Sequence, residues 1–195
     1  LLTRWDAYRY ECDGRIFGQE TSEVLLADRW HDPVDLEVTV PVLHRGMCDV
    51  APLDPRREND RLRLMSFVWP DQHERLALLE AALRNAVNDE LRVEQADAGE
   101  WLDHNLLQRP AGALTIVFHA IVWQYLPRAT KDRMRQVLQR EGDRTSNDRP
   151  IAWVRLEPLG AVADLRITLW PGGEEQRFLT SSYHGANVRT LEHGS

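Results

Sequence analysis

The sequence predicts an α/β fold in which a mostly parallel sheet carries helices on both faces. From residue 41 onward, short apolar segments typical of strands alternate with segments of helical periodicity, which is the pattern of parallel sheets. Near the C-terminus, two alternating segments flank "PGG", which predicts an antiparallel hairpin. With 195 residues, we expect a single domain over 1–195, with a β-hairpin insertion at 1–32 and a core at 41–195.

The first third of the chain has the pattern of strands joined by turns. "WDAYRYEC" alternates aromatic and polar residues, "DG" favours a tight turn, and "SEVLLADRW" is expected to return as the second strand. "VDLEVTV" (34–40) also alternates and is bracketed by prolines. "PVLHRGMCDVAPLD" then predicts a strand up to about Cys48, followed by a turn rich in aspartate and proline.

Helical periodicity is strongest at 70–87, where Asp71 is the expected N-cap and Glu74 follows three residues later. Segment 127–140 is a second clear helix, with three apolar residues on its inward face: Met134, Val137 and Leu138. The other expected elements are helices at 58–69 and 98–108, strands at 91–97, 115–119 and 150–159, a surface loop at 141–150, and hairpin strands at 163–170 and 174–184.

Composition excludes several classes of function. The net charge is −7 and the basic residues are scattered, so no electrostatic footprint for nucleic acid is visible. No apolar run approaches the roughly 18 residues of a membrane span, and the N-terminus does not resemble a signal peptide. We therefore expect a cytoplasmic protein without a membrane partner. The two cysteines, Cys12 and Cys48, are expected to be reduced thiols.

Polar residues gather at the predicted strand ends, where ligands bind in an open parallel sheet. They are, in chain order, Asp49, Asp54, Asp97, His119 and Glu157. Carboxylates at such positions suit the ribose hydroxyls and the adenine amine of a nucleoside cofactor. Each aspartate also has a structural interpretation, because aspartate is common in turns and caps helices.

His119 lies where a hydrophobic strand runs into a turn before a helix. An imidazole there suits a general base or a group that orients an acceptor, with Trp123, Gln124 and Tyr125 on the same turn. The alternative is a core histidine bonded to a backbone carbonyl. The other histidines show no metal-ligand spacing, so no metal is assigned, and no nucleophile motif is present to support a hydrolase.

Several motifs resemble a bacterial family known as domain of unknown function 2332. They are "RGMCDVAPLDP", "SFVWPDQHERLALLEAAL", "TIVFHAIVWQYLP", "AWVRLEP" and "ITLWPGGEE", in the family's order and over essentially the whole chain. Ala51 and Ala120 depart from the pattern, which typically has asparagine and serine there.

The family looks like class I S-adenosylmethionine-dependent methyltransferases, which have a Rossmann-like sheet. The resemblance implies that Asp49 holds the ribose and that Asp97 faces the adenine. It places Phe118 and His119 beside the transferred methyl group. With these, Asp54 and Ala98 complete the expected cofactor residues, and Trp123 and Tyr125 are the expected substrate residues.

The resemblance also implies that the usual first strand and its glycine-rich loop lie before Leu1, so that this chain lacks the central strand. We then expect the sheet to close the gap, to borrow a strand from a partner chain or to use the N-terminal hairpin. The leading hypothesis is transfer of a methyl group to an unknown small molecule. The alternative is a non-enzymatic protein-interaction domain on a degenerate methyltransferase fold, with a homo-oligomer as one form.

Overall fold

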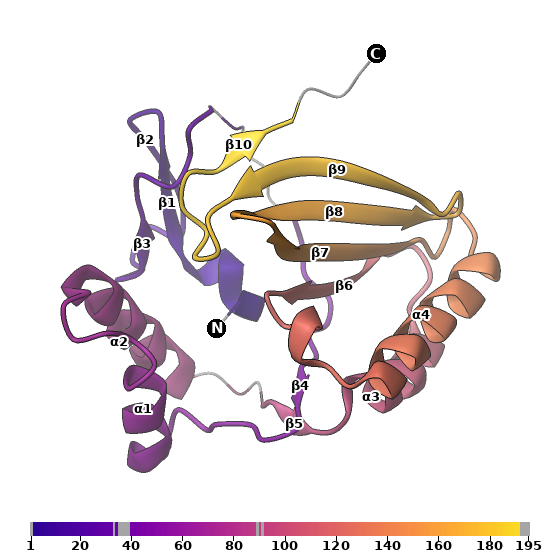
Figure 1. The fold of residues 1–195 in the computed structure, drawn as a ribbon, viewed down its shortest axis with the longest axis horizontal. Helices are drawn as coiled ribbons and strands as arrows, with labels where there is room; N and C mark the ends of the chain where they lie inside the picture. The colour runs from indigo at the N-terminus through magenta and orange to yellow at the C-terminus, as the bar shows by residue number, and fades with distance from the viewer. Residues whose placement is uncertain (1, 33, 35–39, 89, 91, 192–195) are drawn as a thin grey trace. The chain divides into compact units, whose positions relative to one another are not determined.

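A computed structural model describes residues 2–32, 34, 40–88, 90 and 92–191 (Figure 1). Over these residues the chain is a mixed α/β protein with four α-helices and three sheets. It divides into two compact units. The first comprises residues 1–28 and 33–95, and the second comprises residues 29–32 and 96–195.

The first unit begins with a short 3-10 helix, η1 (Leu2–Ala7), and a three-stranded sheet. Strands β1 (Arg9–Cys12) and β2 (Arg15–Gly18) pair antiparallel across the two-residue turn Asp13-Gly14, where both residues have positive φ. The predicted hairpin is confirmed, but its second strand was assigned wrongly. The later segment supplies β3 (Leu25–Leu26) instead, which lies parallel to β1, because so short a turn leaves room only for the strand that follows it.

Helices α1 (Glu58–Met65) and α2 (His73–Val87) confirm two of the predicted helices. The predicted cap of α2 is wrong. The helix starts after Gln72, and no side-chain cap bond is made there. The buried face of α2 belongs to a core cluster of this unit, made of Tyr8, Val24, Ala81 and Ala82.

The strands predicted around Cys48 and at 91–97 are reduced to two residues each. Strand β4 (Cys48–Asp49) pairs in parallel with β5 (Glu94–Gln95), and the two form a sheet of their own. The strand predicted at 34–40 falls mainly on residues 35–39, which lie outside the described residues.

The second unit is built on a five-stranded sheet. Its strands are β6 (Thr115–Ala120), β7 (Ile151–Leu159), β8 (Val162–Trp170), β9 (Glu174–Ser181) and β10 (Arg189–Thr190), in the order β10-β9-β8-β7-β6. Only β6 and β7 pair in parallel, so the sheet is largely antiparallel and the expected mostly parallel sheet is wrong. The cause is the connection between β7 and β8, which is only Gly160-Ala161, whereas a parallel crossover needs about a dozen residues or more.

Two helices, α3 (Ala98–Asn105) and α4 (Arg128–Asp143), pack together on one side of this sheet (Figure 1). The 3-10 turns η2 (Leu106–Gln108) and η3 (Trp123–Tyr125) follow α3 and β6. The buried core of the unit consists of Leu102, Leu106, Met134, Val137, Leu138, Ile151, Trp153 and Trp170. The inward face predicted for α4 is therefore confirmed.

The three sheets share no strand among the described residues. Among the described residues β6 is an edge strand, β4 pairs with β5, and the N-terminal hairpin pairs with β3. The order of the strands does not define a Rossmann sheet.

Candidate functional site

Strands β6 and β7 bring a histidine and a glutamate to the same face of the sheet. Side chains alternate along a strand, so Ile151, Trp153, Arg155 and Glu157 share the face of β7 that the core residues mark as helix-facing. In the parallel register His119 lies opposite Arg155. The polar residues Arg155 and Glu157 therefore follow the buried residues Ile151 and Trp153 along the same face.

His119 and Glu157 form a close pair. Nδ1 of His119 lies 2.6 Å from Oε1 of Glu157, and both side chains are largely buried. The same carboxylate accepts backbone N–H bonds from Val122 at 3.3 Å and Trp123 at 3.2 Å. With Glu157 ionised, Nδ1–H is the donor, which leaves the lone pair on Nε2. Nε2 is buried and has no hydrogen-bond partner in the structure.

Two tryptophan rings enclose the histidine. Trp123 stacks on His119 with ring centroids 5.2 Å apart and planes 13° apart, and Trp153 is tilted at 5.9 Å. An arginine lies over each of these rings, with Arg135 4.9 Å from the centroid of Trp123 and Arg155 3.9 Å from that of Trp153. The imidazole therefore has few rotamers open to it, and its orientation is fixed by packing as well as by Glu157.

The turn after His119 contains an unusual backbone conformation. Ile121 has φ of 51°, in the left-handed region that β-branched residues rarely adopt. Such conformations cost on the order of 1–3 kcal/mol and persist only where the surroundings impose them. Here the N–H of Ile121 donates to the carbonyl of Leu156 at 2.9 Å. The chain then reverses, so that the next two amides reach Glu157.

Asp97 is the N-cap of α3. Its Oδ1 accepts from the backbone N–H groups of Gly99 at 2.9 Å and Glu100 at 3.2 Å, and its Oδ2 accepts from the hydroxyl of Thr130 at 2.5 Å. The Thr130 hydroxyl, more than any other group, holds the pKa of Asp97 below its usual range. Three of about four acceptor positions are thus used. This is the capping interpretation that the sequence left open.

Asp49 and Asp54 belong to the first unit and are also held locally. Oδ1 of Asp49 accepts the N–H of Ala51 at 2.8 Å in a short turn. Asp54 forms two hydrogen bonds with the Arg56 guanidinium, at 2.7 and 2.6 Å, which lower its pKa to about 2. Asp97 and His119 lie in the second unit, whereas Asp49 and Asp54 lie in the first.

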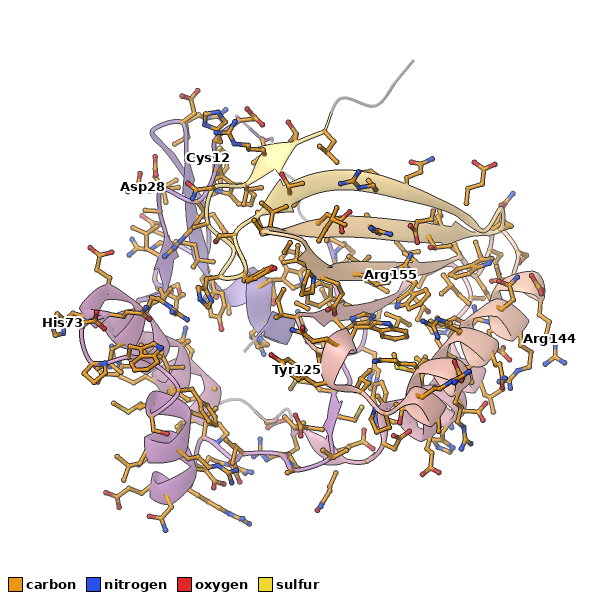
Figure 2. The ribbon with its side chains drawn as sticks, in the orientation of Figure 1. Cys12, Asp28, His73, Tyr125, Arg144 and Arg155 are labelled. Atoms are coloured by element: carbon orange, nitrogen blue, oxygen red, sulfur yellow. The ribbon has the colours of Figure 1, made fainter. Side chains whose placement is uncertain are left out.

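The other predicted residues separate into two groups. Trp123 joins the histidine cluster, and Ala98 packs against the core as the first residue of α3. Phe118 precedes His119, so its side chain is on the opposite face of the sheet, where it is 45% exposed. Tyr125, labelled in Figure 2, is the last residue of η3 and is 76% exposed.

Sequence reasoning placed Glu157 at a predicted strand end but did not pair it with His119, and it did not single out Trp153 or Arg155, although these residues form one side of the site. The signal was present in "IAWVRLEPL", because strict alternation places all three on one face of the strand. Arg135 gave no comparable signal, because an arginine beside the buried stripe of a helix is common. Among the described residues no group of three or more metal-ligating side chains gathers, and no helix there is long and apolar enough to cross a membrane.

The second unit of this α/β protein thus carries a buried histidine–glutamate pair beneath tryptophan rings, on the helix-covered face of its sheet. A family model described as an uncharacterised protein conserved in bacteria, DUF2332, matches residues 1–189, and the chain belongs to that family. No curated protein matches the chain, and no solved structure does.

Proposed function

We propose that His119 and Glu157 form the proton-accepting centre of an enzyme that transfers a group to a small-molecule acceptor. One observation carries this proposal. Glu157 occupies Nδ1 of His119 at 2.6 Å, and Nε2 is left in the interior with no partner. A histidine with only a structural role normally has both ring nitrogens satisfied, because an unpaired buried polar atom costs about 1–3 kcal/mol.

The pair is suited to accept a proton. A carboxylate on Nδ1 fixes the tautomer that leaves Nε2 as acceptor, and it stabilises the imidazolium that forms when Nε2 takes a proton. An acceptor hydroxyl, amine or thiol that loses its proton to Nε2 becomes the stronger nucleophile. Because Nε2 has no exposed surface, the reactant gains access when a neighbouring side chain moves. We assign this motion to Trp123, which stands on the single turn η3.

Methyl transfer from S-adenosylmethionine is the group transfer that the resemblance to methyltransferases implies. The residues fit this cofactor only in part. Asp49 is exposed and has one carboxylate oxygen not engaged by the described residues, whereas the oxygens of Asp97 are used to join α3 to α4. Asp97 therefore does not fit an adenine contact. We include the cofactor in the proposal as the methyl donor and derive no step through it.

The test measures binding of the methyl donor separately from the action of the His119–Glu157 pair, called the dyad below. Calorimetric titration of S-adenosylmethionine and S-adenosylhomocysteine into the protein measures donor binding. Incubation with methyl-tritiated donor and a bacterial small-molecule extract then measures transfer. We expect His119→Gln and Glu157→Gln to lower the labelled product about 10²–10⁴-fold, the usual contribution of a general base, with donor binding unchanged.

His104→Gln and Glu174→Gln are matched controls at exposed positions outside the dyad, and they should keep full transfer. Thermal melting of all four variants identifies any loss that comes from unfolding. If neither donor binds, the cofactor is removed from the proposal. Transfer by His119→Gln at the wild-type rate, in a folded protein, would contradict the role of the dyad.

A second candidate is a protein-interaction domain, and the edge strand β6 favours it. Ile116 and Phe118 are 57% and 45% exposed on a strand that pairs on one side only among the described residues. Exposed edges of this kind invite pairing with another chain. Light scattering on the purified protein tests it: a homo-oligomer that Ile116→Lys dissociates supports this function, and a strict monomer with no bound protein argues against it.

A further inference from the structure

The helix-covered face of the sheet also holds a hollow of about 830 Å³, between α4 and strands β7 to β9. Its wall includes the indole rings of Trp153 and Trp170, the guanidinium of Arg155 and the hydroxyl of Thr168, with Arg135 and Arg140 contributed by α4. None of these side chains takes the proton in the function proposed above. The hollow is therefore a separate feature that requires its own explanation.

Three buried N–H donors in this wall have no acceptor. They are Nε of Arg155, Nε1 of Trp153 and Nε1 of Trp170. An unpaired buried donor is unfavourable, so three in one wall represent a large unfavourable contribution unless something accepts from them. The unpaired buried side-chain atoms around the hollow are donors without exception among the described residues. These atoms, like Nε2 of His119, have no exposed surface, so a ligand gains access to them when side chains of the wall move. Such a ligand must bring acceptors, and an oxyanion brings several.

Arg155 is held in position before any ligand arrives. Its Nη2 donates to Thr168 at 2.8 Å and to Glu175 at 2.6 Å, and its guanidinium lies 3.9 Å from the centroid of Trp153. In Figure 2 its label marks it on β7. Burial lowers the pKa of Arg155, so the charge is partly desolvated despite Glu175. A rigid, partly desolvated guanidinium with a free N–H is well suited to hold a carboxylate or phosphate.

Two glycines pack closely against the indole ring of Trp170 near Nε1. A Cβ on Gly142 would lie 2.5 Å from Nε1 of Trp170, and a Cβ on Gly173 would lie 3.0 Å from the same atom. A side chain at either position would therefore crowd the ring. The chain thus places residues without side chains on both sides of an indole N–H that has no partner within the protein.

We propose that the hollow binds the carboxylate or phosphate group of an organic anion, and that this anion is the acceptor molecule that the dyad deprotonates. The second part rests on the proposed function. It is supported by the position of His119, which lies opposite Arg155 in the register of β6 and β7 and 5.9 Å from the Trp153 ring. An anionic group at Arg155 directs the remainder of the molecule along Trp153 toward His119.

Binding is measured without any turnover, by tryptophan fluorescence and calorimetry with benzoate, phenyl phosphate and neutral benzyl alcohol. We expect saturable binding of at least one anion and none of the alcohol. Comparison of benzoate with phenyl phosphate shows which oxyanion the wall prefers. Arg155→Gln should weaken binding about tenfold to hundredfold, the usual cost of a hydrogen bond to a charged group. Trp153→Phe keeps the ring but removes one donor, and should weaken it less.

Arg128→Gln is the matched control, since Arg128 is a fully exposed arginine on α4 outside the hollow and its loss changes the net charge equally. Absence of saturable binding by both anions, equal binding of benzyl alcohol, or unchanged affinity in folded Arg155→Gln and Trp153→Phe would each overturn the proposal. Anion binding without group transfer would leave the pocket standing and count against the proposed function. Group transfer without anion binding would support the proposed function and count against the pocket.

Discussion

At the scale of single residues, Asp97 joins two helices through one carboxylate. It accepts two backbone N–H bonds from the first turn of α3 and one hydroxyl bond from Thr130 at the start of α4. A helix N-terminus has four unpaired N–H groups and a partial positive charge, so an ionised side chain satisfies both needs at once. Asp97 therefore contributes to the stability of the unit that holds the dyad.

Replacement of Asp97 by alanine should lower the free energy of unfolding by about 1–2 kcal/mol, the upper part of the range for an N-cap, because the bond to Thr130 is lost as well. Asp97→Asn should cost less, since its amide oxygen still caps the helix. Urea unfolding at pH 7 measures both values. Asp132→Ala, at an exposed position on α4, is the control and should change stability by less than about 0.5 kcal/mol. Equal stability of Asp97→Ala and the wild type would contradict the capping role.

At the scale of elements, the local sequence pattern was sufficient to locate most helices and the long strands. Helices α1 to α4 and strands β6 to β9 lie where periodicity and alternation placed them. The pattern could not supply pairing partners, because alternation shows that one face of a strand is buried without showing what it pairs with. It identified His119 and Glu157 at strand ends but did not pair them, because their contact joins residues 38 apart in the chain. The contact depends on the register of β6 and β7.

The packing of α4 on Trp170 allows an element-scale prediction. Alanine at position 142 gains about 1 kcal/mol of helix propensity over glycine, but its Cβ would lie 2.5 Å from a buried indole that cannot swing away. Overpacking costs about 1–3 kcal/mol, so we expect Gly142→Ala to be destabilising by up to about 2 kcal/mol. Thermal and urea unfolding give the value.

A double-mutant cycle with Trp170→Leu supplies the control for this substitution. The smaller side chain removes the clash, so Gly142→Ala should be neutral or stabilising in that background. If the alanine costs the same in both backgrounds, the contact with Trp170 is not what requires glycine at this position.

At the scale of the whole molecule, charge decides how stability depends on pH. The chain has 31 acidic residues and 24 lysines and arginines, and several of the arginines form ion pairs. The guanidinium of Arg56 lowers the pKa of Asp54 to about 2, and hydrogen bonds from Arg140 and Arg133 lower that of Asp103. When carboxylates protonate, these attractions are lost and the arginines repel one another.

We therefore expect the protein to lose stability steadily as the pH falls below about 4. Asp54 has its ordinary pKa of about 3.9 in the unfolded chain and a lower one in the folded chain, so the unfolded state binds more protons in this range. The stabilisation is complete above the unfolded value and disappears as the pH falls through the folded value of about 2.

Urea midpoints at pH 5, 4, 3 and 2.5 should fall in that order. Arg56→Gln should flatten the decline, and Arg128→Gln should not, because among the described residues Arg128 pairs only with the half-exposed Asp132 on its own helix. Added salt at 1 M should flatten it in every variant, since exposed pairs are screened. Midpoints that stay constant from pH 5 to 2.5 would show that these ion pairs do not contribute to folding.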